Sequence, residues 1–267
     1  MSDNAYYQKV NQYYNQDASH FEERYGDNDL LQHIRSSFRK ETLSYTGKTI
    51  LEIGYGPGFD LVFFGSHDPG AAVYGIDISD EMKNLAENNI RRAGLANVTA
   101  AVGSVEDLHT LFPGVTFDAI YVYFGALNTV KDLDKAASIL EGLLKPGGHM
   151  ALTFINKYYL ALVLKNLVHG RFSLAFSRLR RIWGGYSPYR HLESRCYSYR
   201  DIRKHFSSFT LLRKRGYSIC YPAWYEHKKF KGKSRLLEKL WNIDKALNKT
   251  FLWQYGEYCL YIFRKKS

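Results

Sequence analysis

Between residues 48 and 156 the sequence alternates short apolar runs with segments of helical periodicity. Each apolar run has the length of a buried strand, and the segments between them place apolar side chains three and four positions apart. Because strands that alternate with helices are joined by crossover connections, they lie parallel in one sheet with helices on both faces. The pattern therefore predicts a doubly wound α/β fold. Its strands are expected at residues 49–53, 72–76, 98–102, 117–124 and 149–155.

The sequence after residue 156 differs from this core in rhythm and in charge. Residues 1–156 hold 12 Lys/Arg and 20 Asp/Glu, a net charge of −8, whereas residues 157–267 hold 25 and 6, a net charge of +19. Such a basic section is typical of proteins with an anionic partner, although its charges could also simply solvate the surface. We expect helices at residues 158–183, 199–206 and 228–249, and an antiparallel pair of strands at 209–220 and 258–263.

Composition excludes several classes of protein. The 22 Tyr and 16 Phe are incompatible with intrinsic disorder. Three cysteines, Cys196, Cys220 and Cys259, are too few and too far apart for a disulfide framework, which favours a reducing compartment. The first residues lack the basic and apolar regions of a signal peptide, and no apolar run is long enough to span a membrane. We therefore expect a cytoplasmic protein that could still contact a membrane peripherally.

A glycine-rich turn directly follows the first expected strand. Glycines there let the backbone adopt positive φ and let a ligand approach the main chain closely. Asp77 ends the second strand, where a carboxylate can accept both hydroxyls of a ribose. Glu52 at the mouth of the turn would repel a phosphate, and Pro57 removes an N–H donor that a phosphate would use. The turn therefore favours a nucleoside cofactor that carries a cationic group.

Five motifs, in order along the chain, resemble those of the class I S-adenosylmethionine-dependent methyltransferases. They read EIGYGPG at 52–58, GIDIS at 75–79, GSVEDL at 103–108, FDAIYVYFGALNTV at 117–130 and LLKPGGHMALTF at 143–154. The resemblance implies a mostly parallel, seven-stranded, Rossmann-like sheet in the order 3-2-1-4-5-7-6 with an inserted helical cap. It implies S-adenosyl-L-methionine as cofactor and methyl transfer as the activity.

The resemblance also assigns roles to individual residues. The glycines of the turn would hold the methionine part of the cofactor, Asp77 would bind the ribose, and residues after the second and third strands would contact the adenine. Ser104 departs from the Asp that many relatives carry at its position, but it keeps a hydrogen-bond acceptor. The cofactor-binding residues so implied are Glu52, Gly54, Gly56, Gly58, Asp77, Ile78, Ser104, Val105 and Tyr123.

Missing motifs narrow the choice of methyl acceptor. Adenine- and glutamine-directed relatives carry Asn/Asp-Pro-Pro-Tyr after the fourth strand, and metal-dependent catechol enzymes carry paired acids, but residues 123–126 of this chain read YFGA. All three cysteines lie beyond the position of the nucleophile of cytosine C5 enzymes. No Cys/His cluster has the spacing of metal ligands. We therefore expect metal-independent, in-line transfer to a small-molecule or lipid-like acceptor of anionic or amphipathic character.

Two alternatives stay open at this stage. Basic residues interleaved with aromatic residues could bind RNA, although no separate RNA-binding module is visible. The chain could also be a non-catalytic binding module that keeps the fold. We divide it into an N-terminal helical lid at residues 1–45, an S-adenosylmethionine-binding core at 46–156, and the basic acceptor-cap insertions with the last strands at 157–267. Its oligomeric state is not encoded in any motif.

Candidate catalytic residues come from two segments outside the core. If the acceptor requires a general base, His191 is the best-placed histidine, with Trp183 and Tyr189 beside it facing the methyl position. Tyr14 is the second candidate, on an N-terminal helix expected to close over the cofactor. A stripe at helical spacing in the basic section would either pack on the sheet or lie on a membrane surface. It consists of Leu236, Leu240, Ile243 and Leu247.

Overall fold

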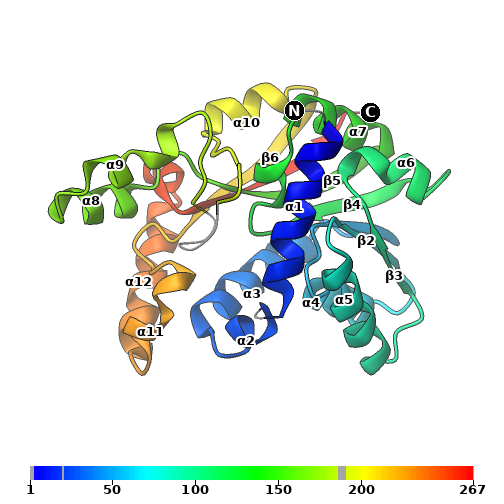
Figure 1. Ribbon diagram of the computed structural model, residues 1–267, viewed down its shortest axis with the longest axis horizontal. Coiled ribbons are helices and arrows are strands. Elements are labelled where there is room, and N and C mark those ends of the chain that lie inside the picture. The colour runs from blue at the N-terminus through cyan, green and yellow to red at the C-terminus, as the bar shows by residue number, and fades with distance from the viewer. Residues whose placement is uncertain (1–2, 20, 186–190, 267) are drawn as a thin grey trace.

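The computed structural model describes residues 3–19, 21–185 and 191–266 (Figure 1). One seven-stranded sheet forms the centre of the molecule, with its strands in the order β3-β2-β1-β4-β5-β7-β6. β1 to β5 are parallel to one another, whereas β7 is antiparallel to both β5 and β6. The predicted doubly wound sheet and its strand order are confirmed. The strands are β1 (Thr49–Ile53), β2 (Ala72–Asp77), β3 (Val98–Val102), β4 (Phe117–Val122), β5 (Leu144–Ile155), β6 (Phe209–Tyr217) and β7 (Tyr258–Lys265).

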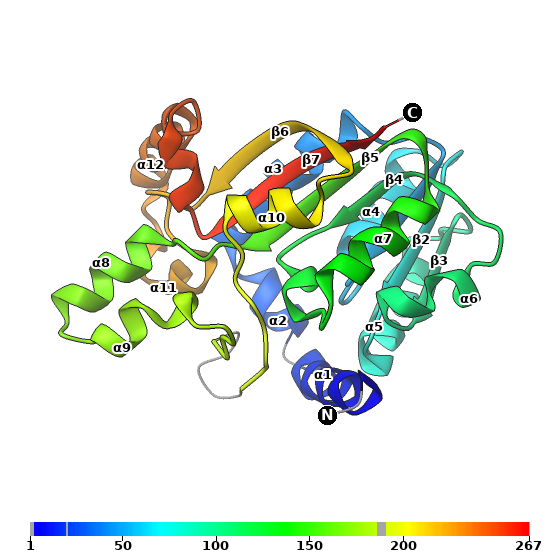
Figure 2. The ribbon, with the colours of Figure 1, turned by 90° about the horizontal axis from the view of Figure 1, so that it is seen from above.

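Helices cover both faces of this sheet (Figure 2). One apolar core lies between the sheet and α6, α7 and α10, and a second lies between the sheet and α3, α4, α5 and α12. The α-helices are α1 (Asp3–Ala18), α2 (Phe21–Gly26), α3 (Asp29–Leu43), α4 (Phe59–His67), α5 (Asp80–Arg92), α6 (Leu108–Leu111), α7 (Leu133–Leu143), α8 (Leu160–Val168), α9 (Phe172–Ala175), α10 (Tyr199–His205), α11 (His227–Phe230) and α12 (Ser234–Leu247). Short 3-10 helices are η1 (Val105–Asp107), η2 (Ala126–Thr129), η3 (Ser177–Leu179), η4 (Trp224–Glu226) and η5 (Phe251–Tyr255).

The helix α5, which follows β2, shows how local sequence positions the site. Ser79 is its N-cap, and the Ser79 hydroxyl accepts a hydrogen bond from the N–H of Met82 at 3.1 Å. Acidic residues occupy its first turn and Arg91 and Arg92 its last, as the helix dipole favours. Because the cap fixes where α5 begins, it also fixes the direction in which the end of β2 points.

The single helix expected at residues 158–183 is interrupted in the structure. Gly170 adopts a left-handed φ of +67°, and its N–H donates to the carbonyl of Leu167. The N–H of Arg171 donates a hydrogen bond to the carbonyl of Asn166 at 2.8 Å, which completes a Schellman motif and ends α8. The chain then forms α9 and η3, so the segment becomes a helical hairpin.

The expected apolar stripe on α12 is partly wrong in register. Leu240 and Leu247 are half-buried, but Leu236 and Ile243 are 43% and 45% exposed. Asp244 lies on the buried face instead, where its carboxylate accepts three backbone N–H groups of the turn at 219–221, at 2.7–3.1 Å. This carboxylate anchors α12 to the turn after β6, and the helix rotates accordingly.

Among the described residues no helix combines the length and the apolar character needed to cross a bilayer.

Candidate functional site

A pocket opens at the carboxyl ends of β1, β2 and β4, the edge at which doubly wound sheets bind ligands. Loops from the sheet form its floor, and α1 and α2 contribute the side chains that cover it. The floor comes from the glycine turn after β1, from the residues after β2 and β3, and from residues 123–130 after β4. The basic section contributes Trp224 and Tyr258 to the wall.

The glycine turn requires glycine at its first position. Gly54 has a φ of +74°, and a Cβ built on it would lie 2.5 Å from the Cβ of Ala126. Gly56 also has a positive φ, of +55°. Gly58 differs from both: it is the N-cap of α4, and its Cβ would lie 2.8 Å from the Cβ of Ala86 on α5. Gly54 and Gly56 therefore face the pocket, whereas Gly58 permits close packing of α4 against α5.

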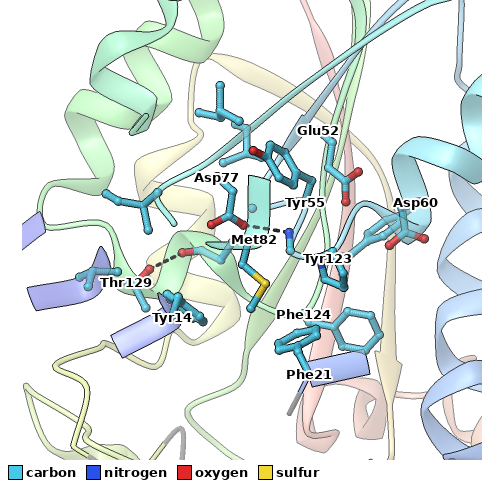
Figure 3. A pocket seen from close by; sticks show the side chains of 18 of the residues that line it. Tyr14, Phe21, Glu52, Tyr55, Asp60, Asp77, Met82, Tyr123, Phe124 and Thr129 are labelled. Carbon is cyan, nitrogen blue, oxygen red and sulfur yellow. Dashed lines mark hydrogen bonds between the residues drawn. The ribbon is translucent and has the colours of Figure 1, made fainter. Parts of the chain in front are cut away.

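Asp77 links the end of β2 to this turn. Its Oδ2 accepts a hydrogen bond from the N–H of Gly56 at 2.8 Å, and its Oδ1 accepts one from the N–H of Ser79 at 3.0 Å. Burial raises the pKa of Asp77 to about 6, against the opposing effect of these backbone donors. The carboxylate points into the pocket, where its remaining lone pairs can accept hydroxyl donors (Figure 3).

The N-terminal helix α1 is tied across the pocket at both ends. Asn11 donates to the carbonyl of Ile78 at 2.6 Å, and Asn15 accepts from the hydroxyl of Ser79 at 2.6 Å. Tyr6 donates to the carbonyl of Thr129, on the far side, at 2.7 Å. α1 thus bridges the residues after β2 and those after β4, and it brings Tyr7, Val10, Tyr13, Tyr14 and Asp17 into the lining.

Aromatic side chains form the part of the pocket beyond β4. Phe124 follows β4 with a φ of +53°, a conformation that costs free energy for a residue with a Cβ and that is found most often at functional sites. Its ring lies edge-on to Tyr25 and to Tyr258, at centroid distances of 6.4 and 5.7 Å. The indole N–H of Trp224 donates to the Tyr258 hydroxyl at 3.1 Å, and Phe21 stacks on Tyr25. We call Phe21, Tyr25, Phe124, Trp224 and Tyr258 the aromatic compartment.

A buried cluster of charges lies beneath this compartment. Arg35 of α3 forms an ion pair with Asp60, whose other oxygen accepts from the Nε of Arg39 at 2.6 Å. The Arg35 guanidinium lies 4.5 Å from the ring centre of Tyr25 and 5.0 Å from that of Phe124. Its Nε is buried and has no hydrogen-bond partner among the described residues. An unsatisfied donor of this kind at a pocket floor suits an oxygen of a ligand.

Glu52 lies beside this cluster at the end of β1. Its Oε2 accepts the hydroxyl of Tyr121 at 2.8 Å. Burial, together with the neighbouring Asp60 carboxylate, raises the pKa of Glu52 well above its usual range. Arg35 and Glu52 both line the pocket, so the carboxylate of a ligand could pair with the guanidinium, and its ammonium group could donate a hydrogen bond to the Glu52 carboxyl group.

The structure brings together most of the cofactor residues implied by the resemblance. The pocket lining contains Glu52, Gly54, Gly56, Asp77, Ile78, Ser104, Val105 and Tyr123, and only Gly58 lies outside it. Sequence reasoning missed Arg35. The available signal was its position on α3, where it is a charged residue among the buried apolar side chains of one helical face.

The two candidate catalytic residues lie in different places. Tyr14 lines the pocket, where burial raises the pKa of its hydroxyl well above the usual value. His191 is exposed and is not part of the lining, and a Cβ on Gly184 would meet its ring. Trp183 also lies outside the lining, with its ring over the guanidinium of Arg178. Tyr189 lies outside the described residues. A role of His191 as general base therefore stays a prediction that would require its loop to move.

The described residues contain no group of three or more His, Cys, Asp or Glu side chains that could hold a metal ion.

The strand order, the glycine turn after β1 and the carboxylate at the end of β2 together define a class I S-adenosylmethionine-dependent methyltransferase. Residues 45–186 match the family model described as "Methyltransferase domain". Because this match covers more than half of the chain, the protein belongs to that family. It is an S-adenosylmethionine-dependent methyltransferase, and S-adenosylmethionine is its cofactor.

Individual relatives are similar over different lengths. The chain is 24% identical to an uncharacterized protein of Methanocaldococcus jannaschii, over 96% of this chain and 90% of the relative. It is 31% identical to the ubiquinone/menaquinone biosynthesis C-methyltransferase UbiE of Pasteurella multocida, over 49% of this chain and 50% of the relative. The chain therefore matches about half the length of that enzyme. The crystal structure of an S-adenosylmethionine-dependent methyltransferase from Mesorhizobium loti shares the fold with a TM-score of 0.58, at 19% identity over 86% of this chain and 96% of that one.

Proposed function

We propose that this methyltransferase transfers the methyl group to a small-molecule or lipid-like acceptor with a flat apolar body. The observation that carries the proposal is the aromatic compartment, which adjoins the glycine turn within one pocket. All five rings of this compartment line the pocket, and a planar, apolar group can pack against such a wall. An acceptor bound there lies beside the floor assigned to the cofactor, as direct transfer requires.

Different residues of the pocket floor could bind the ribose, the adenine and the methionine part of S-adenosylmethionine. We assign the ribose to Asp77, whose carboxylate faces the pocket, and the adenine to Ile78, Ser104 and Val105. Arg35 and Glu52 would bind the carboxylate and ammonium of the methionine part. When bound, the cofactor supplies a methyl group on a positively charged sulfur, and the aromatic rings nearby favour that charge and exclude water.

No histidine belongs to the lining that the described residues form, so we propose a methyl transfer in which no histidine of the lining acts as general base. Tyr14 holds its proton at neutral pH since burial raises its pKa, so it would orient an acceptor rather than deprotonate it. Four carboxylates belong to the lining: Asp60 has two arginines, Glu52 has Tyr121, Asp77 has backbone donors, and Asp17 is not free either. We therefore propose metal-independent, in-line transfer in which alignment supplies most of the rate enhancement.

The domain division receives support from the origin of the lining. Residues 1–45 contribute the covering side chains Tyr14, Phe21 and Tyr25, consistent with a helical lid. Residues 157–267 contribute Trp224 and Tyr258 to the aromatic compartment, consistent with an acceptor cap. The name of the Pasteurella relative, a ubiquinone/menaquinone C-methyltransferase, supports an amphipathic ring compound as one acceptor to try first.

A comparison of candidate acceptors tests the proposal. The purified protein is incubated with S-adenosylmethionine labelled in the methyl group and with hydroquinones, phenols, phosphorylated amines or total RNA in separate reactions. We expect label in the apolar ring compounds and expect Phe124→Ala to reduce it. Label in RNA alone would contradict the proposal and favour the RNA alternative. Phe63→Ala, which removes a half-buried ring outside the pocket, is the matched control.

A further inference from the structure

The helical hairpin at residues 158–182 carries an unusual apolar surface. Fourteen large apolar side chains of the described residues are exposed, and nine of them belong to this hairpin. Val168 is 84% exposed and Phe172 is 65% exposed, at the turn between α8 and α9. Leu160, Leu164 and Val168 follow one another at intervals of four, so they form a single line along α8. The others are Tyr158, Leu174, Phe176, Leu179 and Ile182.

All Lys, Arg, Asp and Glu side chains of the same segment are basic. Residues 157–192 contain no Asp or Glu, although they contain seven Lys or Arg. Arg178 is buried against Glu257 and holds the base of the hairpin, whereas Arg171, Arg180 and Arg181 are exposed among the apolar side chains. A protein partner would need both an apolar surface and acidic side chains placed opposite these arginines. An anionic lipid surface matches both the bases and the apolar side chains.

The hairpin also lies at the end of the molecule that contains α11 and α12, away from β3 and α6 (Figures 1 and 2). Its base is connected to the pocket wall. Tyr159, which precedes α8, hydrogen bonds to Tyr225, and the neighbouring Trp224 donates to Tyr258 of the aromatic compartment. A ligand taken from a surface at the hairpin would therefore meet the wall of the pocket close by.

We propose that the hairpin at residues 158–182 is a docking surface for anionic lipid bilayers. Its apolar tip enters the interface between headgroups and acyl chains while Arg171, Arg180 and Arg181 contact acidic headgroups. This surface replaces the stripe on α12 as the place of membrane contact, since that helix packs on the protein through Leu240 and Asp244. The proposal does not depend on which acceptor is methylated.

Vesicle binding tests the contribution of the apolar side chains to membrane docking. The full chain is sedimented with vesicles of phosphatidylcholine alone or mixed with phosphatidylglycerol. We expect binding to the mixed vesicles, reduced more than roughly tenfold by V168D/F172D. Phe251→Asp introduces one negative charge at a ring that is 68% exposed outside the hairpin, and it should bind as the wild type does. A wild-type protein that ignores anionic vesicles, or a double variant that binds them equally well, would overturn the proposal.

A second set of variants tests the electrostatic contribution of the arginines to membrane binding. R180Q/R181Q should weaken binding to the mixed vesicles roughly 30-fold, at about 1 kcal/mol per base. R91Q/R92Q removes two exposed bases at the end of α5 and should have no effect. Salt at about 1 M should weaken wild-type binding because it screens the attraction. Equal losses in the two double variants would show a response to net charge alone and would overturn the assignment to the hairpin.

Two further measurements keep the result interpretable. Phe172→Trp reports insertion directly, by a blue shift and by quenching with brominated lipid, and a spectrum unchanged by anionic vesicles counts against the proposal. Light scattering identifies the rival occupant: a wild-type dimer that V168D/F172D converts to a monomer would mean that a second copy covers the hairpin. Binding of S-adenosylmethionine should be unchanged in all hairpin variants, so failure of docking and failure of the proposed function remain distinguishable.

Discussion

The Asp77 carboxylate accepts the backbone N–H of Gly56 at 2.8 Å, so the end of β2 holds the turn that follows β1. The contact joins the glycine turn and the end of β2, which belong to two separate sequence motifs. It also places a buried anion where a positive φ has brought the main chain to the pocket surface. Binding of a ribose at Asp77 and the shape of the glycine turn are therefore coupled through one side chain.

Cofactor binding should weaken at acidic pH because of this residue. Burial raises the pKa of Asp77 to about 6, and the ionised form is the one that can accept both ribose hydroxyls. Affinity is therefore present above this pKa and lost as the pH falls through it, by roughly tenfold per unit below it. Calorimetric titrations between about pH 5 and pH 7 measure the effect. Asp77→Asn should bind more weakly at neutral pH, with a flat profile, and a wild-type profile equally flat would contradict the assignment.

Replacement of Gly54 with alanine should lower the free energy of unfolding, whereas replacement of Gly142 with alanine should not. Gly54→Ala places a Cβ 2.5 Å from that of Ala126 at a φ of +74°. We expect a loss of about 2 kcal/mol in the free energy of unfolding, together with weaker cofactor binding. Gly142→Ala, within α7, meets nothing within 4 Å and should add about 0.5–1 kcal/mol. Urea unfolding compares the two, and equal destabilisation would show that conformation and space at the turn are not decisive.

The sequence predicted the sheet well and the basic section less well. The runs at 49–53 and 98–102 coincide with β1 and β3, because short runs made mostly of apolar residues are typical of strands in a sheet covered by helices. The helical hairpin was missed because one glycine, Gly170, ends α8 within a segment of helical composition. The rotation of α12 depends on a turn far away in the chain, whose N–H groups bind Asp244.

The candidate site also contains residues that the sequence predicted and residues that it did not. Most of the residues predicted from motifs next to strand ends line one pocket, because parallel strands bring their carboxyl ends to one edge. Arg35 precedes all of the motifs, and only the packing of α3 beneath the pocket reveals it. The strained φ of Phe124 could not be inferred either, since nothing in a Phe-Gly pair fixes a positive φ on the Phe.

Phe124 should control acceptor binding separately from cofactor binding. Phe124→Ala removes the ring between Tyr25 and Tyr258 and should raise the KM of an apolar acceptor about tenfold, the effect of one or two ring contacts. The Kd of S-adenosylmethionine should stay within roughly a factor of two. Steady-state kinetics and titration calorimetry separate the two quantities. If the variant lost cofactor affinity and acceptor affinity in equal measure, the aromatic compartment would belong to the cofactor site instead.

Arg35 should bind the carboxylate of the methionine part of the cofactor. Arg35 lines the pocket, and its Nε is a buried donor without a partner among the described residues. Arg35→Met should weaken S-adenosylmethionine roughly tenfold to a hundredfold, the effect of one hydrogen bond to a charged group. Methylthioadenosine, which has the same nucleoside and sulfur but no amino acid part, should bind Arg35→Met and the wild type alike. Arg39→Gln is the matched control, because Arg39 pairs with the same Asp60 without lining the pocket. Equal losses for both ligands would mean that Arg35 only maintains the fold of the floor, and an unchanged cofactor Kd with a raised acceptor KM would assign its Nε to the acceptor.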